Sequence, residues 1–298
     1  MEIDSRFAAL SEVGRLVSVL VKHARDAFGD QQTIGEQWHS LNFTAAPDYA
    51  AAIDEYDRFL DILRSSGTDV HFLPRDATTT LDSIYARDAS MVSPRGIILS
   101  SMGKRARQAE PTAQERAFRS LGPIAIQGRI DPPGLLEGGD VVWLDTRTLA
   151  VGRGYRTNAA GIAQLRSMFG SAIEVVDVPL PHWRGERDVM HLMSLVSPVD
   201  RDLAVVYSPL LPVPFRKLLL GRGYRLIEVP DDEFASMGCN VLALAPRRCV
   251  IVAGNPQTRS ALESAGAEVI EYVGAEISVK GAGGPTCLTR PIERAPIE

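Results

Sequence analysis

The chain repeats one phrase, an amphipathic helix that ends at a glycine and leads into a strand, at intervals of about fifty residues. The first copy runs from Pro47 to Pro74, with Pro47 in the first turn of the helix and Gly67 at its end. Its apolar helical face consists of Ala52, Tyr56, Phe59, Leu60 and Leu63. The phrase returns four more times, and the predicted strands end near residues 74, 130, 179, 230 and 273.

Short β-rich segments lie between the copies, and each is typical of a hairpin with a proline, aspartate or arginine turn. Their sequences are ASMVSPRGIILS, DVVWLDTRTLAVG, LVSPVDRDLAVVYS and VLALAPRRCVIVAG. A strand predicted at residues 15–23 completes the set. Mixed phrases of this kind indicate α/β modules, and five units of similar length can close into a ring without capping repeats. A doubly wound open sheet is the alternative. No linker divides the chain, so we expect one domain over residues 1–298.

Composition and charge exclude several classes of protein. Hydrophobic residues make up 45% and charged residues 23%, as in an ordinary soluble globular protein. A net charge of -5 argues against nucleic acid as a partner, because phosphate binding needs clustered Lys and Arg. The chain has no signal-peptide pattern and no apolar run long enough for a membrane span. Three cysteines, an odd number, fit a reducing compartment. We therefore expect a cytoplasmic protein.

Carboxylate, imidazole and thiol side chains recur at matched points of the repeat. If the modules form a ring, the loops that carry them point at one axis, and residues far apart in sequence meet in one pocket. That layout is typical of an enzyme. These residues are Asp82 and Asp88 in LDSIYARDAS, Glu137 and Asp140 in LEGGDVVWL, His191 in VMHLMS, Cys239 in MGCNV and Cys287 in GAGGPTCLT.

Cys287 is the candidate nucleophile, because a thiol in a glycine-rich loop is accessible to a ligand. Cys239 and Cys249 have aliphatic neighbours, and we expect both to be buried. His191 also has apolar neighbours, so it fits either a core histidine or a general acid and base. In EGGD, Glu137 can face the pocket while Asp140 holds a loop, although a solvated turn explains the tetrapeptide equally well.

Asp82 and Asp88 bracket the segment SIYAR, and two pocket carboxylates suit a planar guanidinium cation. A metal is the rival interpretation. However, the chain has no HxH, HExxH or CxxC spacing, so we predict no metal. The basic cluster KRAR at residues 104–107 is predicted to be a solvated face.

The order of these motifs resembles the guanidine-modifying superfamily, whose fold is the five-bladed α/β-propeller called the pentein fold. Its members include dimethylarginine dimethylaminohydrolases, arginine deiminases and amidinotransferases. The resemblance covers nearly the whole chain and is greatest to the bacterial dimethylarginine dimethylaminohydrolases. It rests on DSIYARD, EGGD, HL, the RTNAAG helix start, YRLIEVP, PQTRSALESAGAEVIE and the glycine-rich loop with Cys287. A five-bladed propeller of ββαβ-type modules is therefore expected.

The resemblance implies a mechanism without a cofactor, acting on a small guanidino amino acid. Cys287 would attack the central guanidinium carbon, and a covalent thiouronium intermediate would be hydrolysed to a urea such as citrulline. His191 would protonate the leaving amine and then activate water, while Glu137 would bind the substrate nitrogens and orient the site. The remaining implied roles are guanidinium binding by Asp88 and Asp82, and binding of the substrate α-carboxylate by Arg107 and Arg156. A homodimer is compatible with the sequence.

Two residues depart from the expected pattern and bear on the substrate. Arginine deiminases carry an acid two residues after the histidine, where this chain has Met193, and an apolar corner suits a methylated nitrogen. Dimethylarginine dimethylaminohydrolases usually have Lys there, and an acid where this chain has Arg87. Dimethylarginine is the favoured substrate. The alternative substrates are arginine and another guanidino or ureido compound, and the alternative reaction is amidino transfer. A non-enzymatic ribosome-binding factor of the same fold is a further alternative, but the retention of Glu137, His191 and Cys287 argues against it.

Overall fold

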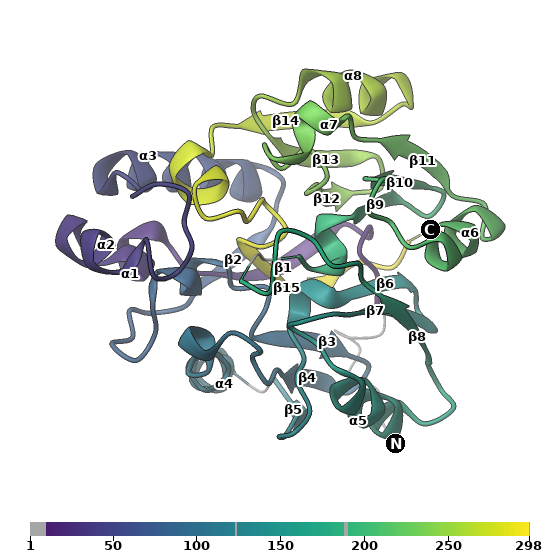
Figure 1. The fold of residues 1–298 in the computed structure, drawn as a ribbon, viewed down its shortest axis with the longest axis horizontal. Coiled ribbons are helices and arrows are strands. Elements are labelled where there is room, and N and C mark those ends of the chain that lie inside the picture. Colours follow the sequence, from purple (N-terminus) through teal and green to yellow (C-terminus); the bar gives the residue numbers. More distant parts are fainter. Residues whose placement is uncertain (1–9, 123, 188–189, 298) are drawn as a thin grey trace.

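The computed structural model describes residues 10–122, 124–187 and 190–297, and its strands form five three-stranded sheets. In every sheet one strand lies in the middle, antiparallel to one neighbour and parallel to the other. A helix connects the two parallel strands, which is the ββαβ module that the sequence predicts. The fold is a five-bladed α/β-propeller, with the helices around the outside of the sheets (Figure 1).

Four blades are contiguous in sequence. Blade two contains β3 (Ser90–Ser93), β4 (Gly96–Leu99), α4 (Glu110–Ser120) and β5 (Ile126–Arg129). Blade three contains β6 (Val141–Asp145), β7 (Thr148–Arg153), α5 (Ala159–Phe169) and β8 (Glu174–Pro179). Blade four contains β9 (Val196–Asp200), β10 (Leu203–Val206), α6 (Val213–Gly221) and β11 (Arg225–Glu228). Blade five contains α7 (Asp231–Phe234), β12 (Leu242–Ala245), β13 (Arg248–Val252), α8 (Pro256–Ser264) and β14 (Glu268–Tyr272).

The first blade is built from both ends of the chain. Its middle strand β1 (Leu16–Val21) pairs antiparallel with β15 (Thr289–Arg294) and parallel with β2 (Asp69–Phe72). The helices α1 (Ala24–Phe28), α2 (Gln31–Gln37) and α3 (Tyr49–Ser65) connect β1 to β2. The strand predicted at 15–23 is therefore confirmed as the piece that completes the set. The sequence indicated neither its partner β15 nor the short helices α1, α2 and α7.

In each sheet, the strand that pairs antiparallel with the middle strand faces the centre of the propeller. We call it the first strand of its blade; these strands are β15, β3, β6, β9 and β12 for blades one to five. β9 contacts β12, and β15 contacts β3, so first strands of different blades meet each other. Each blade therefore presents to the axis the loop that precedes its first strand. This arrangement matters for function because the candidate residues of the sequence lie in those loops, except for Arg107 and Arg156, which follow the middle strands β4 and β7.

The helix α3 shows how local sequence sets the repeat. Its N-cap is Asp48, whose side chain accepts a hydrogen bond from the backbone N–H of Ala51. Pro47 therefore precedes the cap and is not part of the first turn, which corrects the predicted start. Gly67 has a φ of 79°, which confirms it as the residue that ends the helix. The five residues of the predicted apolar face are all buried.

The predicted strand ends agree with the structure to within two residues: β2, β5, β8, β11 and β14 end at residues 72, 129, 179, 228 and 272. None of the helices in the described ranges is long and apolar enough to cross a membrane.

Gly161 in α5 tests how tightly the helices pack against the loops of the propeller. A Cβ at Gly161 would lie 2.1 Å from the carbonyl oxygen of Leu135, in the segment that leads to the third-blade loop. Gly161→Ala should therefore lower the free energy of unfolding by about 1–3 kcal/mol, although alanine favours helix. The matched control is Gly35→Ala in α2, where a Cβ meets nothing within 4 Å. This change should stabilise by up to about 1 kcal/mol. Urea unfolding measures both, and equal effects would contradict the packing argument.

Candidate active site

All five blades contribute to one cavity of about 590 Å³. Blades one, two, four and five do so through the loops that precede β15, β3, β9 and β12, whereas blade three contributes Arg156, which lies between β7 and α5. Asp88 lies two residues before β3, His191 five before β9, and Cys287 two before β15. Blade five contributes Asn240, two residues before β12. Of the residues expected at the site, those that line the cavity are Asp82, Asp88, Arg107, Arg156, His191 and Cys287.

Glu137 and His191 form a buried ion pair at the third and fourth blades. The Nε2 of His191 lies 2.8 Å from Oε2 of Glu137, and the Glu137 side chain is fully buried. The other carboxylate oxygen, Oε1, accepts hydrogen bonds from the backbone N–H groups of Gly103 and Lys104 at 2.9 and 3.0 Å. Nη1 of Arg156 lies 3.6 Å from the same oxygen. Glu137 thus lies behind His191 and holds its ring.

The charges around His191 keep it protonated near neutral pH. Burial alone lowers the pKa of a histidine, but the carboxylates of Asp88, Asp140 and Glu137 outweigh this effect and raise the pKa of His191 to about 9. Burial alone has the opposite effect on a carboxylate and would raise the pKa of Glu137. The hydrogen bond and charge interaction with His191 outweigh this effect and bring that pKa well below the usual value. The resident form of the pair is therefore imidazolium and carboxylate.

Cys287 is partly exposed in the same cavity, and Asn240 holds its sulfur. Nδ2 of Asn240 donates to Sγ of Cys287 at 3.2 Å, while Oδ1 of Asn240 accepts from the backbone N–H and the hydroxyl of Thr286. Partial desolvation and the nearby charge of Asp88 raise the pKa of Cys287 to about 11, against the opposing hydrogen bond from Asn240. The free cysteine is thus a thiol at neutral pH.

Asn240 was missed in the sequence, although it lies at the matched point of the fifth blade. The segment GCNV contains two candidates for the matched position of the repeat, Cys239 and Asn240. The sequence pattern favours the thiol, but the structure places the polar residue beside it at Cys287. Cys239 and Cys249 are both buried, as expected. Burial raises the pKa of Cys249 to about 12.

Asp88 and Arg107 form a second buried charge pair on the cavity wall. Nη1 of Arg107 donates to Oδ2 of Asp88, and its Nε and Nη2 donate to the two carboxylate oxygens of Glu110 at 2.9 and 2.8 Å. Nη2 also donates to the carbonyl oxygen of Tyr85. The guanidinium of Arg107 is therefore occupied by protein acceptors, and its evident structural effect is to hold Asp88. Oδ1 of Asp88 lies 3.8 Å from Nδ1 of His191.

Asp82 is paired with Lys104, whose Nζ lies 2.7 Å from Oδ2 of Asp82. The prediction that residues 104–107 form a solvated face is therefore wrong for two of the four. Lys104 is half-buried and Arg107 is buried, because the acids of the cavity draw them inward, and only the intervening Arg105 and Ala106 are exposed. Arg156 is buried, and its Nη1 has no hydrogen-bond partner in the described part of the chain.

Asp140 and two glycines hold these loops in place. Oδ1 of Asp140 accepts from the backbone N–H of Leu192, next to His191, at 3.0 Å, as expected for a residue that holds a loop. A Cβ at Gly139 would lie 2.5 Å from Nδ1 of His191, and one at Gly283 would lie 2.3 Å from the ring of Tyr85. Glycine at these positions lets the backbone pass close to the side chains of the site.

Asp88, Glu137 and His191 place ligand atoms within 4.8 Å of one another, a geometry that can hold a metal ion. The same atoms are already engaged, however. Nε2 of His191 contacts Glu137, and the cationic side chains of Arg107 and Arg156 lie beside the two carboxylates. The absence of a metal stays a prediction. The positive charges of Arg107 and Arg156 compete with a metal ion for the two carboxylates, although Oδ1 of Asp88 accepts no hydrogen bond from the described residues.

The two residues that depart from the expected pattern lie in different places. Met193 is buried and lines the cavity together with Met190, which makes that part of the wall apolar. The side chain of Arg87 does not reach this cavity; it donates to Glu12 in a second one. Only its backbone N–H bonds to the active-site loop, at the carbonyl oxygen of Cys287.

Solved structures share this fold. A dimethylarginine dimethylaminohydrolase from Pseudomonas aeruginosa, a mutant in complex with citrulline, superposes with a TM-score of 0.73 at 22% identity, over 93% of this chain and 99% of that chain. An amidinotransferase from Microseira wollei superposes with a TM-score of 0.78 at 16% identity, over 98% of each chain. At this level of identity the likeness concerns the fold.

Sequence comparison is more specific. A dimethylarginine dimethylaminohydrolase from Streptomyces coelicolor is 30% identical over 245 residues, 81% of this chain and 86% of the relative. An arginine deiminase from Mycobacterium marinum is 31% identical, over 83% of this chain and 75% of the relative. The model of the family described as "N,N dimethylarginine dimethylhydrolase, eukaryotic" matches residues 30–294. The chain therefore belongs to this family of amidinohydrolases, within the guanidine-modifying superfamily.

Proposed function

We propose that the protein hydrolyses dimethylarginine to citrulline and dimethylamine, with Cys287 as the nucleophile. The observation that carries the proposal is the meeting of a thiol, an imidazolium and two carboxylates, drawn from three different blades, in one cavity of about 590 Å³. Guanidinium is a planar cation, and carboxylates bind it with charge-assisted hydrogen bonds. Family membership supports the same class of reaction.

In the first half of the reaction, Cys287 loses its thiol proton to solvent as the cationic substrate binds, and Sγ then forms a bond to the central guanidinium carbon. The bond from this carbon to the dimethylated nitrogen then breaks, and His191 supplies the proton with which dimethylamine leaves. Its pKa of about 9 suits this role, because the imidazolium is the dominant form at neutral pH. A covalent thiouronium remains on Cys287.

In the second half, the now neutral His191 takes a proton from water, and the resulting hydroxide attacks the thiouronium carbon. The carbon–sulfur bond breaks, and the thiolate and a ureido product are released. Glu137 orients His191 throughout, and Asp88 with Asp82 faces the guanidinium. The bound cation also favours the thiolate, which offsets the raised pKa of Cys287 in the free enzyme.

The choice of dimethylarginine rests on the apolar wall formed by Met190 and Met193. A carboxylate at residue 193 would bind an unsubstituted guanidinium nitrogen, whereas a thioether accepts methyl groups and offers little to an N–H donor. Arginine deimination is the second candidate, favoured by the 31% identity to the mycobacterial arginine deiminase. The two candidates differ in the amine that leaves.

The state of the thiol predicts how alkylation depends on pH. Because only the thiolate reacts with iodoacetamide, and the pKa of Cys287 is raised to about 11, its rate should rise about tenfold per pH unit between pH 6.5 and 8.5. Asn240→Ala removes the donor to Sγ, so the rate should fall by about tenfold at every pH. Mass spectrometry of the labelled peptide follows both, with Cys287→Ser as background. A plateau below pH 7 would mean that the thiolate is already formed in the free enzyme.

A product assay tests the proposed reaction. Dimethylarginine, monomethylarginine, arginine and agmatine are supplied separately, and amine and ureido products are quantified. We expect dimethylamine and citrulline from dimethylarginine, abolished in Cys287→Ser and retained in the control Cys249→Ala, whose thiol is buried away from the cavity. Ammonia and citrulline from arginine alone would replace the proposal with arginine deimination. No turnover of any of the four would reject both.

Arg156 is proposed to bind the substrate α-carboxylate, since it lines the cavity and its Nη1 is unpartnered. Arg156→Ala should raise KM for dimethylarginine by about tenfold to a hundredfold, the loss of a charge-assisted hydrogen bond. The same change should leave KM for agmatine, which lacks the carboxylate, nearly unaltered. Steady-state kinetics measure this difference, provided that wild type turns over both compounds. Equal losses would assign Arg156 instead to support of Glu137, its neighbour at 3.6 Å.

A further inference from the structure

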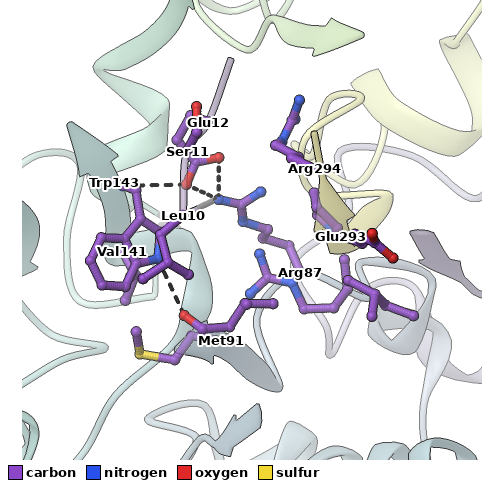
Figure 2. Close-up of a pocket in the computed structure, with 13 residues that line it drawn as sticks. Leu10, Ser11, Glu12, Arg87, Met91, Val141, Trp143, Glu293 and Arg294 are labelled. Atoms are coloured by element: carbon purple, nitrogen blue, oxygen red, sulfur yellow. Dashed lines mark hydrogen bonds and ion pairs between the residues drawn. The ribbon is translucent and has the colours of Figure 1, made fainter. Parts of the chain in front are cut away.

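A second cavity lies among the first strands of three blades and shares no lining residue with the catalytic cavity. It is formed by residues of β3, β6 and β15 together with the segment 10–12, which precedes β1 (Figure 2). Its free volume is about 30 Å³, enough for one or two water-sized particles. The proposed reaction uses none of its residues.

Three arginines line this small cavity. Arg87, Arg290 and Arg294 are 2%, 4% and 5% exposed, so their positive charges are almost completely withdrawn from water. Burial of a charge is costly unless it is paired. Three cations in one buried space therefore require negative partners.

The described chain supplies one fully engaged carboxylate here. Both oxygens of Glu12 accept hydrogen bonds from Nη2 of Arg87 at 2.8 Å, as the dashed lines in Figure 2 show. Glu293 also lines the cavity, but it is only half-buried and its carboxylate points away from Glu12 and Arg87 (Figure 2). Asp88 is close enough to act on Arg290 but is already paired with Arg107.

The arginines also retain donors without acceptors. Nη1 of Arg290 donates to the carbonyl oxygen of Ser90 at 2.6 Å, and Nη1 of Arg294 donates to those of Gly14 and Ala243 at 2.6 and 2.9 Å. The buried Nε atoms of all three arginines, and Nη1 of Arg87, have no acceptor in the described residues. Buried donors in proteins are nearly always satisfied, by protein, water or an ion.

The burial of these charges lowers the pKa values of two of the arginines. Burial, followed by repulsion from Arg87, brings the pKa of Arg290 well below its usual value. Burial likewise lowers the pKa of Arg294 to about 10. Both pKa values are lowered chiefly by burial, and Arg87 adds a repulsive contribution in each case. A negative ligand would relieve this repulsion.

We propose that this cavity is a binding site for one small monatomic anion, of the size and charge of chloride, held by Arg87, Arg290 and Arg294 beside Glu12. An anion supplies both negative charge and an acceptor for the N–H donors that have no partner in the described residues. The free volume of about 30 Å³ suits one such ion and is small for phosphate or the carboxylates of metabolites. The site lies apart from the catalytic cavity, so its existence does not depend on the proposed reaction.

The test compares thermal unfolding of the full chain in sodium chloride and in sodium gluconate at equal ionic strength, since gluconate is too large for the cavity. A chloride concentration about ten times the dissociation constant should raise Tm by about 2–3 °C, in a saturable manner. Crystals soaked in bromide should show an anomalous scattering peak between the three arginines. Identical Tm values in the two salts, with no bromide peak in the cavity, would overturn the proposal.

Variants identify the residues that respond. Glu12→Gln removes the engaged carboxylate at constant shape, so chloride should bind more tightly and raise Tm by more than in wild type. Arg290→Met should abolish the chloride response, whereas the exposed Arg95→Met should retain it. If Arg290→Met does not fold, Arg294→Met and the bromide peak of the wild type decide the question. The double change Glu2→Gln with Asp4→Asn tests whether the chain's own carboxylates supply the negative charge. A chloride response that appears only in this variant would mean that they do so in the wild type, and would overturn the proposal.

Discussion

The pairing of β15 with β1 determines where the thiol lies relative to the rest of the site. Cys287 is two residues before β15, so the antiparallel register in which Val19 faces Pro291 places this loop at the axis. The other loops are each positioned by a blade of contiguous sequence. Only the first blade joins the two ends of the chain, and without it His191 and Cys287 would share no common wall. Propeller closure is therefore a condition for the chemistry as well as for the fold.

Around that axis the chain arranges buried charges in alternating order. One series runs from Arg156 to Glu137 to His191, and another from Glu110 to Arg107 to Asp88. Buried ion pairs contribute little net stability, because desolvation offsets their attraction. Their value here is functional. They keep His191 protonated while they hold Asp88 ready for a cation, and each carboxylate has a donor that fixes its direction.

The catalytic cavity and the small arginine-lined cavity lie on opposite sides of the same loop. The segment 87–90 carries Asp88 on one side and Arg87 on the other, with adjacent residues pointing in different directions. The Arg87–Asp88 pair thus lies between two environments. Arg87 lines the small cavity, and Asp88 lines the catalytic cavity, where it is proposed to face the substrate. The proposed preference for dimethylarginine rests instead on the wall that contains Met193.

The sequence by itself determined the modular architecture, because helix periodicity, glycine helix ends and hairpin turns are local properties. For the same reason the ends of the outer strands and the burial of Cys239 and Cys249 could be predicted, and the matched points of the repeat identified Asp88, His191 and Cys287. Tertiary structure decided what depends on partners distant in sequence. Lys104 and Arg107 turn inward because Asp82 and Asp88 face them, Asn240 acquires its importance from a sulfur 47 residues away, and Arg87 turns to Glu12. Such side-chain directions follow from the balance of burial and charge around a shared axis, and no local pattern encodes that balance.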